Sequence, residues 1–358
     1  MASVEWGEYR IDDLFNIYTG RDVIIGKTSP GEIPLISHQN TENGVTRRIE
    51  HISNRRIFHY EETISLADRG VFYATTQNED FHIGTRVKAL VFKDGKKSEN
   101  VRLFFSSAIN KLQILFTDYS SNATDKLPKY KIQLPVLNGQ IDYNFMESFI
   151  EELEAERIEE LEAYLSVSGL KDTQLTADEL SALDKFNSIN WKKFNLETLF
   201  GKSTRGKRLK GDDRIGGNLP FVTAGETDEG ISAFISNDVE IFSSNTTTID
   251  MFGSAKYRNY NYGADDHIAV VHTENLSKYA AIFVTSACHK SAHNGDFSYS
   301  RNFYAKDADK LYISLPVKNE QPDYELMSTL ISAIQKLVIA DVVKFSDEKI
   351  KATKQVVG

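Results

Sequence analysis

Two stretches of the chain, residues 1–136 and 191–317, alternate short apolar runs with turn-forming residues. In the first stretch, the runs ETISLA, VKALVF, NKLQILF and KYKIQLPV have the length and apolar content of strands. In the second stretch, TTTIDMF, HIAVVH, AAIFVTSA and KLYISLPV have the same character. Each stretch is therefore expected to form a strand-rich domain with some helix, and the predicted fold class is α+β (mixed α/β).

Directly after each Leu-Pro-Val sequence, the apolar spacing changes to three and four residues, as on one face of an α-helix. Neither segment contains Gly or Pro, and Asp142 and Asp323 stand where an N-cap residue would. We expect two helices of about 20–28 residues, or about 30–40 Å. Their apolar positions are Met146, Phe149, Ile150, Leu153, Leu161, Tyr164 and Leu165 in the first, and Met327, Leu330, Ile331, Ile334, Leu337, Val338 and Phe345 in the second.

Apolar stripes of this length need a partner helix, because one small domain cannot cover them. We therefore expect the two helices to pack antiparallel as a coiled-coil spacer, with the two domains at opposite ends. The alternative is a pair of independent domains with unpaired helices, which leaves both stripes uncovered. A shorter helix is predicted at 176–186, where Thr176 and Glu179 have capping-box spacing.

The two halves of the chain repeat each other in the same order, which predicts an internal duplication with pseudo-two-fold character. WGEYRIDDLF (6–15) resembles WKKFNLETLF (191–200), and IPLISHQNTENGVT (33–46) resembles LPFVTAGETDEGIS (219–232). DFHIG (80–84) aligns with DDHIA (265–269), which places His82 over His267. LPVLNGQIDYNFM (134–146) and LPVKNEQPDYELM (315–327) are identical at eight of thirteen positions. The predicted order is domain 1–137, helical segment 138–188, domain 189–318 and helical segment 319–358.

The net charge of −9 is concentrated in one segment. Residues 146–190 contain twelve acidic and three basic residues, which accounts for the whole imbalance. The remainder is neutral and has local basic clusters such as GKSTRGKRLKGDDR (201–214), so the overall charge does not exclude nucleic acid. One cysteine, no secretory leader and no apolar run near the roughly 18–20 residues of a membrane span predict a soluble, cytoplasmic protein.

The sequence shows no catalytic constellation. NLPF (218–221) resembles the methyltransferase motif Asn-Pro-Pro-Phe but lacks its second proline, and no P-loop, dinucleotide fingerprint or nucleophile elbow is present. Cys288, His289 and His293 offer three zinc ligands without a fourth, so a buried cysteine at a strand end is favoured over a metal site. His82 and His267 are expected to be structural. No metal is predicted.

The halves differ mostly in polar segments, and the side chains there are of the kinds that bind DNA. Arg, Lys, Asn, Gln, Ser and Thr recognise base edges, and Lys and Arg also bind phosphates. The same residue types are common in ordinary loops, which is the alternative for any one of them. The candidates are His38, Gln39, Asn40, Arg69, Thr76, Gln77, Asn78, Lys126, Lys202, Arg205, Lys207, Arg208, Lys210, Thr223, Glu226, Lys256, Tyr257, Arg258, Tyr260, Lys290, His293, Asn294, Tyr299 and Arg301.

The chain resembles the specificity subunits of type I restriction–modification systems and of related bipartite-site type IIB/IIG systems. The resemblance rests on the opening of each half, the Leu-Pro-Val before each helix, the helical segments themselves, and TIDMFGSAKY and YNYGADDHIAVV in the second half. It covers nearly the whole chain. It implies that each domain is a target recognition domain for one half of a split site in double-stranded DNA.

The resemblance also implies that the helices set the spacing of the half-sites and bind methyltransferase subunits, in two copies, with a restriction subunit or a fused nuclease completing the complex. Catalysis then belongs to the partners, and S-adenosylmethionine and magnesium are expected only on them. The near-neutral domains suggest weak DNA affinity for this chain alone. The helix residues expected to face partners are Met146, Ile150, Leu153, Leu161, Met327, Ile331, Ile334 and Val338.

Two other classes of function remain open at this point. One is a duplicated protein- or glycan-binding adaptor with a coiled-coil spacer, in which Tyr257, Tyr260 and Tyr262 line a ligand cleft. The other is an enzyme active on its own, which methyl transfer by the purified chain would reveal.

Overall fold

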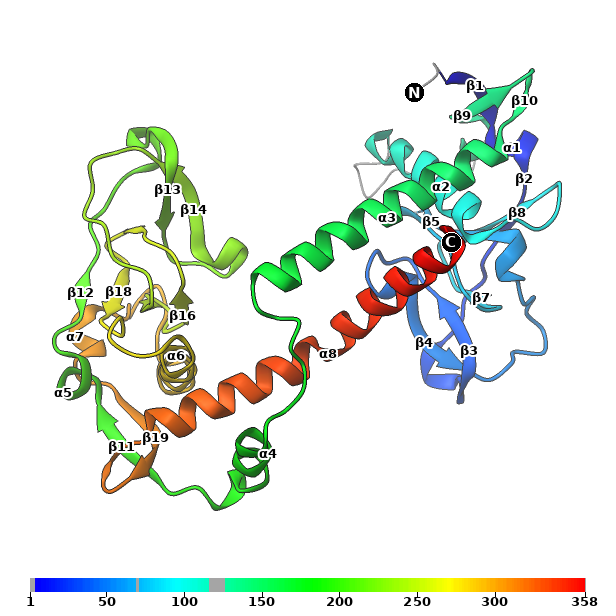
Figure 1. Ribbon diagram of the computed structural model, residues 1–358. Coiled ribbons are helices and arrows are strands. Elements are labelled where there is room, and N and C mark those ends of the chain that lie inside the picture. Colours follow the sequence, from blue (N-terminus) through cyan, green and yellow to red (C-terminus); the bar gives the residue numbers. More distant parts are fainter. Residues whose placement is uncertain (1–3, 69–70, 116–125, 358) are drawn as a thin grey trace. The chain divides into compact units, whose positions relative to one another are not determined.

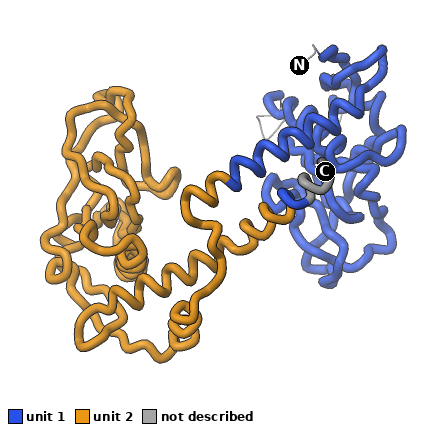
Figure 2. Tube along the Cα trace, viewed as in Figure 1, with its two compact units in different colours: residues 1–162, 349–358 blue, residues 163–348 orange. Residues whose placement is uncertain are grey.

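The computed structural model describes residues 4–68, 71–115 and 126–357, with side chains through Lys351. It divides into two compact units (Figure 2). Unit 1 comprises residues 1–162 and 349–358, and unit 2 comprises residues 163–348. Each unit has its own hydrophobic core.

Three sheets form unit 1 (Figure 1). Their strand orders are β1-β9-β10, β2-β8-β5-β6 and β4-β3-β7, and all pairs are antiparallel except the short parallel pair of β3 with β7. The strands are β1 (Glu5–Arg10), β2 (Phe15–Thr19), β3 (Pro30–Ile36), β4 (Val45–Ile49), β5 (Thr63–Asp68), β6 (Phe72–Thr75), β7 (His82–Ile83), β8 (Val87–Phe92), β9 (Lys131–Leu137) and β10 (Gln140–Ile141).

Helix α2 contacts β5, β6 and β9, and it buries Phe105 and Ile109 in the core of unit 1. Ser98 caps the helix by accepting a hydrogen bond from the Val101 N–H. The helical elements of this unit are α1 (Ile11–Leu14), α2 (Glu99–Asn110), α3 (Tyr143–Val167, in this unit through Glu162) and the 3₁₀ turns η1 (Ile25–Lys27), η2 (Glu42–Gly44), η3 (Tyr60–Glu62), η4 (Lys111–Leu115) and η5 (Leu127–Lys129).

Unit 2 repeats this plan, with strand orders β11-β19-β20, β12-β18-β15-β16 and β14-β13-β17. Helix α6 takes the place of α2 and contacts β15, β16 and β19. The strands are β11 (Trp191–Asn195), β12 (Thr204–Arg205), β13 (Gly216–Val222), β14 (Ile231–Ile235), β15 (Thr246–Asp250), β16 (Ala255–Arg258), β17 (Gly263–Ala264), β18 (Ile268–Val271), β19 (Tyr312–Lys318) and β20 (Gln321–Pro322). The helical elements are α4 (Ala177–Asp184), η6 (Phe186–Ser188), α5 (Leu196–Phe200), η7 (Gly211–Asp213), η8 (Thr227–Gly230), α6 (Lys278–Ala292), α7 (Ala305–Ala308) and α8 (Tyr324–Val357, in this unit through Glu348).

Strand register confirms the duplication residue by residue. Trp6 lies opposite Pro135, and Trp191 lies opposite Pro316 in the same way. The β3–β4 and β13–β14 pairs have irregularities at corresponding places, one of them directly before Ile36 and Val222. The predicted α+β fold with two homologous domains is therefore confirmed.

The alignment of His82 with His267 is wrong. In the parallel strand pairs, His82 lies opposite Leu35, and the corresponding partner of Phe221 is Gly263. His82 is buried, and its two ring nitrogens contact the Arg56 carbonyl at 2.9 Å and the Ile52 N–H at 3.3 Å. Its structural role is thus confirmed, although the repeat position that suggested the role does not exist.

Two of the predicted strands are helical. AAIFVTSA lies in α6, and the described part of NKLQILF forms the end of α2 and η4. In α6 the buried residues recur every three or four positions (Ala280, Ala281, Val284, Thr285, Cys288 and Ala292), because only one side of the helix packs on the sheet. Further apolar residues of α6 lie between these buried positions. The segment is therefore continuously apolar in the sequence, as a buried strand is.

The two long helices begin where the sequence predicts. Asp142 accepts a hydrogen bond from the Phe145 N–H and Asp323 from the Leu326 N–H, both at 2.9 Å. Helix α3 has 25 residues, which is within the expected length. Helix α8 has 34 residues and is longer than expected. Thr176 and Glu179 form the predicted capping box of α4.

Helix α8 contacts the first helical segment in both units. In unit 1, Lys349 Nζ lies 3.4 Å from the Glu154 carboxylate of α3. In unit 2, Lys336 Nζ lies 3.1 Å from both Asp172 and Glu179.

By length and composition alone, α8 is also apolar enough within Tyr324–Lys351 to cross a membrane, since an 18-residue window of it has a mean hydropathy of 1.7. The expectation that no segment reaches this threshold is therefore wrong. The helix passes this threshold because its apolar residues are not confined to the face that packs on the core. One such helix is weak evidence of a membrane protein.

Candidate functional site

Two corresponding loops carry the most distinct polar sequences of the repeat. Loop 37–44, with the sequence SHQNTENG, joins β3 to β4, and loop 223–230, with the sequence TAGETDEG, joins β13 to β14. His38, Asn40 and Glu226 are exposed in these loops, while Gln39 and Thr223 are half-buried. All five are among the predicted DNA-binding residues, and the structure places them on these two corresponding loops.

Both loops end in three successive left-handed residues, an uncommon conformation for side chains other than glycine. The φ angles are 49°, 52° and 81° for Glu42, Asn43 and Gly44. They are 48°, 55° and 79° for Asp228, Glu229 and Gly230. Such a turn persists only where surrounding contacts hold it.

In unit 1, the side chain of Gln77 holds the turn. Its Nε2 donates to the Asn43 carbonyl at 2.9 Å and contacts the hydroxyls of Thr75 and Ser65 at 3.1 and 3.3 Å. Asn43 in turn donates to the Thr76 carbonyl at 2.6 Å. Gln77 and Thr76 are therefore buried and make structural contacts, and the structure does not present them to a ligand.

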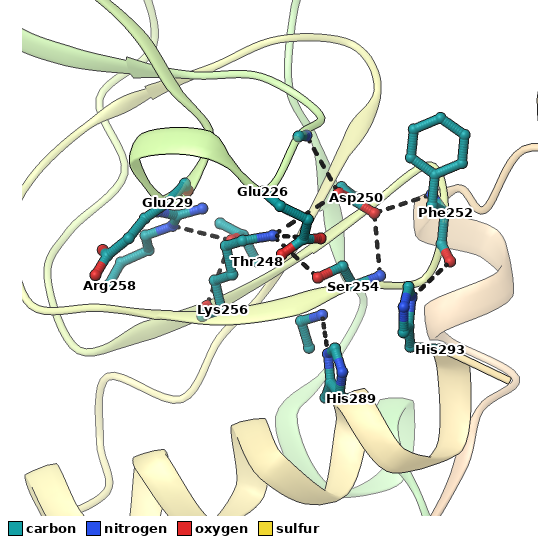
Figure 3. A network of polar contacts seen from close by, with 12 residues as sticks. Glu226, Glu229, Thr248, Asp250, Phe252, Ser254, Lys256, Arg258, His289 and His293 are labelled. Carbon is teal, nitrogen blue, oxygen red and sulfur yellow. Dashed lines mark hydrogen bonds and ion pairs between the residues drawn. The ribbon is translucent and has the colours of Figure 1, made fainter. Parts of the chain in front are cut away.

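In unit 2, Arg258 occupies the equivalent place. Figure 3 shows it beside Thr248 and Glu229. Its Nε donates to the Thr248 hydroxyl, and its Nη1 donates to the Glu229 carbonyl and the Tyr260 hydroxyl, each at 2.9 Å. Only 1% of Arg258 is exposed, so this side chain also lies behind the loop and not on its surface.

A second group of contacts supports loop 223–230. Lys256 Nζ lies 3.2 Å from the Glu226 carboxylate and 3.0 Å from the Ser254 hydroxyl (Figure 3). The buried Asp250 accepts hydrogen bonds from the Phe252 and Ser254 N–H groups at 2.9 and 3.0 Å. Hydrogen bonding from Ser254, together with Lys256, lowers the pKa of Glu226 below its ordinary value. Glu226 therefore stays ionised and can act only as a hydrogen-bond acceptor.

Cys288, His289 and His293 serve the fold of unit 2. Burial raises the pKa of Cys288 to about 12, so its sulfur is a protonated thiol and a poor metal ligand. His289 accepts a hydrogen bond from the Ala255 N–H at 3.2 Å, and His293 Nδ1 lies 3.2 Å from the Phe252 carbonyl. The cysteine is buried as expected, but within α6 and not at a strand end.

The basic residues of 202–210 lie on the surface, and some are already paired. Arg205 binds Asp266 at 3.0 Å, and Lys207 lies 3.8 Å from Glu240. Asp265, Asp266 and His267 form a partly exposed group whose ligand atoms lie within 4.8 Å of one another. His267 pairs with both aspartates and Arg205 pairs with Asp266, so the group is part of a surface ion-pair cluster.

The remaining predicted DNA-binding residues occupy mixed positions. Tyr299 is 85% exposed, which leaves its ring available for stacking. Tyr257 is half-buried and donates to Asn245 at 2.9 Å. Arg69 lies outside the described residues. The other exposed candidates are Asn78, Lys126, Lys202, Arg208, Lys210, Lys290, His293, Asn294 and Arg301.

The tyrosine cleft expected of an adaptor does not form. Tyr262 is fully buried in a core cluster, and its hydroxyl lies 2.8 Å from that of Thr246. It cannot line a surface cleft with Tyr257.

The predicted partner-facing residues divide into two groups. Met146, Ile150 and Met327 are buried in the cores of their own units, because the first turns of α3 and α8 pack on the sheets. Leu153, Ile334 and Val338 are exposed, and Leu161 and Ile331 are half-buried.

An apolar surface missed by the sequence analysis adjoins α8. Trp191 is 44% exposed and stacks on Phe283 of α6 at 6.2 Å, and the two help to line a cavity of about 770 Å³ with Phe186, Ile331 and Ile334. In unit 1, Trp6 stacks on Phe104 of α2 at 6.4 Å. The repeated tryptophans of the two openings were the signal that could have revealed this surface.

Comparison with known proteins identifies the type of molecule. The family model described as Type I restriction modification DNA specificity domain matches residues 3–163 and 188–344. The chain is 23% identical over 345 residues to the Type II restriction enzyme BgcI specificity subunit S.BcgI of Heyndrickxia coagulans, covering 94% of this chain and 96% of that protein. The fold is similar to that of the S subunit of a type I restriction-modification system from M. genitalium, with a TM-score of 0.62, 16% identity, and coverage of 99% of this chain and 95% of that one.

Proposed function

Because the chain belongs to the type I restriction modification DNA specificity family, we propose that each of its two domains recognises one half of a bipartite target in double-stranded DNA. The chain is a specificity subunit, which recognises DNA within a restriction–modification complex and leaves catalysis to other subunits. The observation that supports a bipartite target most directly is the pair of loops 37–44 and 223–230, which share one framework and carry different side chains.

The loop side chains offer suitable chemistry for base recognition. Gln39 and Asn40 are of the types that pair with adenine, and an ionised Glu226 can accept from the amino group of cytosine. Exposed Lys202, Arg208 and Lys210 suit phosphates on the adjacent backbone. The nearly neutral domains suggest that partner subunits contribute much of the phosphate binding.

The exposed apolar residues of the helices and of the tryptophan surfaces suit a protein partner. We assign this partner as the methyltransferase subunit, in two copies because Trp6 with Phe104 and Trp191 with Phe283 form the surface twice. S-adenosylmethionine and magnesium then belong to the methyltransferase and to a restriction subunit or fused nuclease. We place the complex in the cytoplasm, where the single cysteine stays reduced.

A domain exchange tests the bipartite assignment. Residues 1–137 are replaced by the corresponding domain of another specificity subunit, and the methylated bases of host DNA are mapped. One half of the recognised sequence should change and the other half should remain. The reciprocal exchange of 189–318 is the matched control and should change only the other half. An unchanged target after both exchanges contradicts the assignment.

A further inference from the structure

We propose that Gln77 and Arg258 are equivalent positioning residues that hold loops 37–44 and 223–230 in the shape that recognises DNA, and thereby set how strictly each half-site is recognised. The inference rests on the proposed function, in which these loops contact bases. We call the two side chains the bridging residues.

Strand register establishes that the two positions correspond. Ser65 of β5 lies opposite Thr75, and Thr248 of β15 lies opposite Lys256. Each bridging residue follows two positions later, at Gln77 and Arg258. The sequence alone does not align Gln77 with Arg258, and only the structure shows that they share a position of the repeat.

Their contacts correspond as well. Each bridging residue donates to a buried strand hydroxyl, that of Ser65 or Thr248. Each also donates at 2.9 Å to the carbonyl of the middle left-handed residue, Asn43 or Glu229. The bridge therefore connects the rigid four-stranded sheet to the strained end of the loop. Without it, that carbonyl loses its buried donor, and the loop can adopt other conformations.

The charge of each bridging residue complements the charge of its loop. Loop 223–230 carries the acidic residues Glu226, Asp228 and Glu229, and it lies over Lys256 and Arg258. Loop 37–44 carries one acidic residue, Glu42, and the uncharged Thr75 and Gln77 stand at the corresponding strand positions. The three hydrogen-bond acceptors of Arg258 are themselves uncharged, so its buried charge is available to offset the acidic loop. Loop and bridge thus form one matched module in each domain.

The experiment uses the full chain in complex with its methyltransferase, once the target is known. Binding is measured on the cognate duplex and on duplexes with single-base changes in either half-site. Arg258→Gln, which installs the residue of the other half, should reduce discrimination about tenfold at the half-site of unit 2 and leave the other half-site unchanged. Gln77→Leu should do the converse.

Two controls separate positioning from simple destabilisation. Arg10→Gln alters an exposed arginine that pairs with Asp12, and Gln133→Leu alters an exposed glutamine that pairs with Glu8, so both should leave discrimination unchanged. If Arg258→Gln does not fold, Thr248→Val removes one hydroxyl contact and should reduce the same discrimination more mildly. Adding Asp228→Asn to Arg258→Gln should restore part of the thermal stability. It removes one negative charge from a loop that has lost its positively charged bridging residue.

Three results would overturn the inference. One is a lower melting temperature with discrimination intact at both half-sites, which would make the bridges merely structural. Another is an equal loss at both half-sites from either variant. The third is the absence of any stability gain from the added Asp228→Asn. Failure of the domain exchange to move one half-site would instead refute the proposed function, so the two failures are distinguishable.

Discussion

At the scale of single residues, Glu179 shows how charge stabilises unit 2. Ser332 of α8 donates to its carboxylate at 2.6 Å, and Lys336 lies 3.1 Å away. The hydrogen bond from Ser332 is the main cause that lowers the pKa of Glu179 from 4.5 to about 2. Because the folded-state pKa is the lower one, the stabilisation is complete above about pH 4.5 and is lost as the pH falls toward 2.

Replacement of Glu179 should remove this pH dependence. Glu179→Gln should reduce the free energy of unfolding at pH 7 by about 1–3 kcal/mol, because Lys336 loses a buried partner. The difference from the unchanged protein should shrink on acidification to pH 3, as measured by urea unfolding. Glu160→Gln, at an exposed pair with Arg157, is the control and should change stability little. An equal deficit at both pH values would contradict the assignment.

At the scale of secondary-structure elements, the sequence predicted most strands and both long helices. It failed where tertiary packing decides whether an apolar segment is a strand or a helix. The runs at β5, β8, β9, β15, β18 and β19 were recognised because strands buried on a sheet are short and apolar. Helix α6 was missed because Ala and Val occur in either element, and its contact with the sheet is not visible locally. Ser277, which caps α6 by accepting from the Ala280 N–H, was the local sign of a helix.

The candidate site was only partly predictable for the same reason. The sequence pointed to His38, Gln39, Asn40 and Glu226 on the loops. It could not separate them from Gln77 and Arg258, because burial depends on strands that pair across the fold.

Helix α8 also carries a prediction at this scale. A double variant, Ile334→Asp with Val338→Asp, should weaken methyltransferase binding more than tenfold, because two charges would be buried in an apolar contact. The two side chains are 45% and 75% exposed, so the isolated chain should remain folded. Titration with the methyltransferase subunit measures the effect. Ile215→Asp, at an isoleucine that is 61% exposed elsewhere in unit 2, should bind normally. Undiminished binding by the double variant would exclude this surface.

At the scale of the whole molecule, the duplication gives the chain two recognition domains, and the helices α3 and α8 are proposed to fix the distance between them. Helix length then converts into a distance along DNA, where one turn of duplex is about 34 Å. The many acidic residues of α3 are consistent with a spacer directed away from phosphates.

Lengthening the spacer should change the gap between the half-sites. Insertion of one helical turn, about four residues, between Glu156 and Leu165 should alter the accepted number of base pairs while preserving both half-site sequences. Mapping of methylated bases measures this. Four residues inserted after Gly26, in the exposed 3₁₀ turn η1, are the control and should preserve the gap. An unchanged gap in the spacer variant would argue against a fixed separation by the helices.

The two tryptophans have a practical consequence. The chain has only Trp6 and Trp191, one in each unit, and both are about half exposed against a phenylalanine. Fluorescence from these indole rings would therefore report separately on the two halves. With one ring replaced by phenylalanine, the remaining emission would follow events in a single unit, without any added dye.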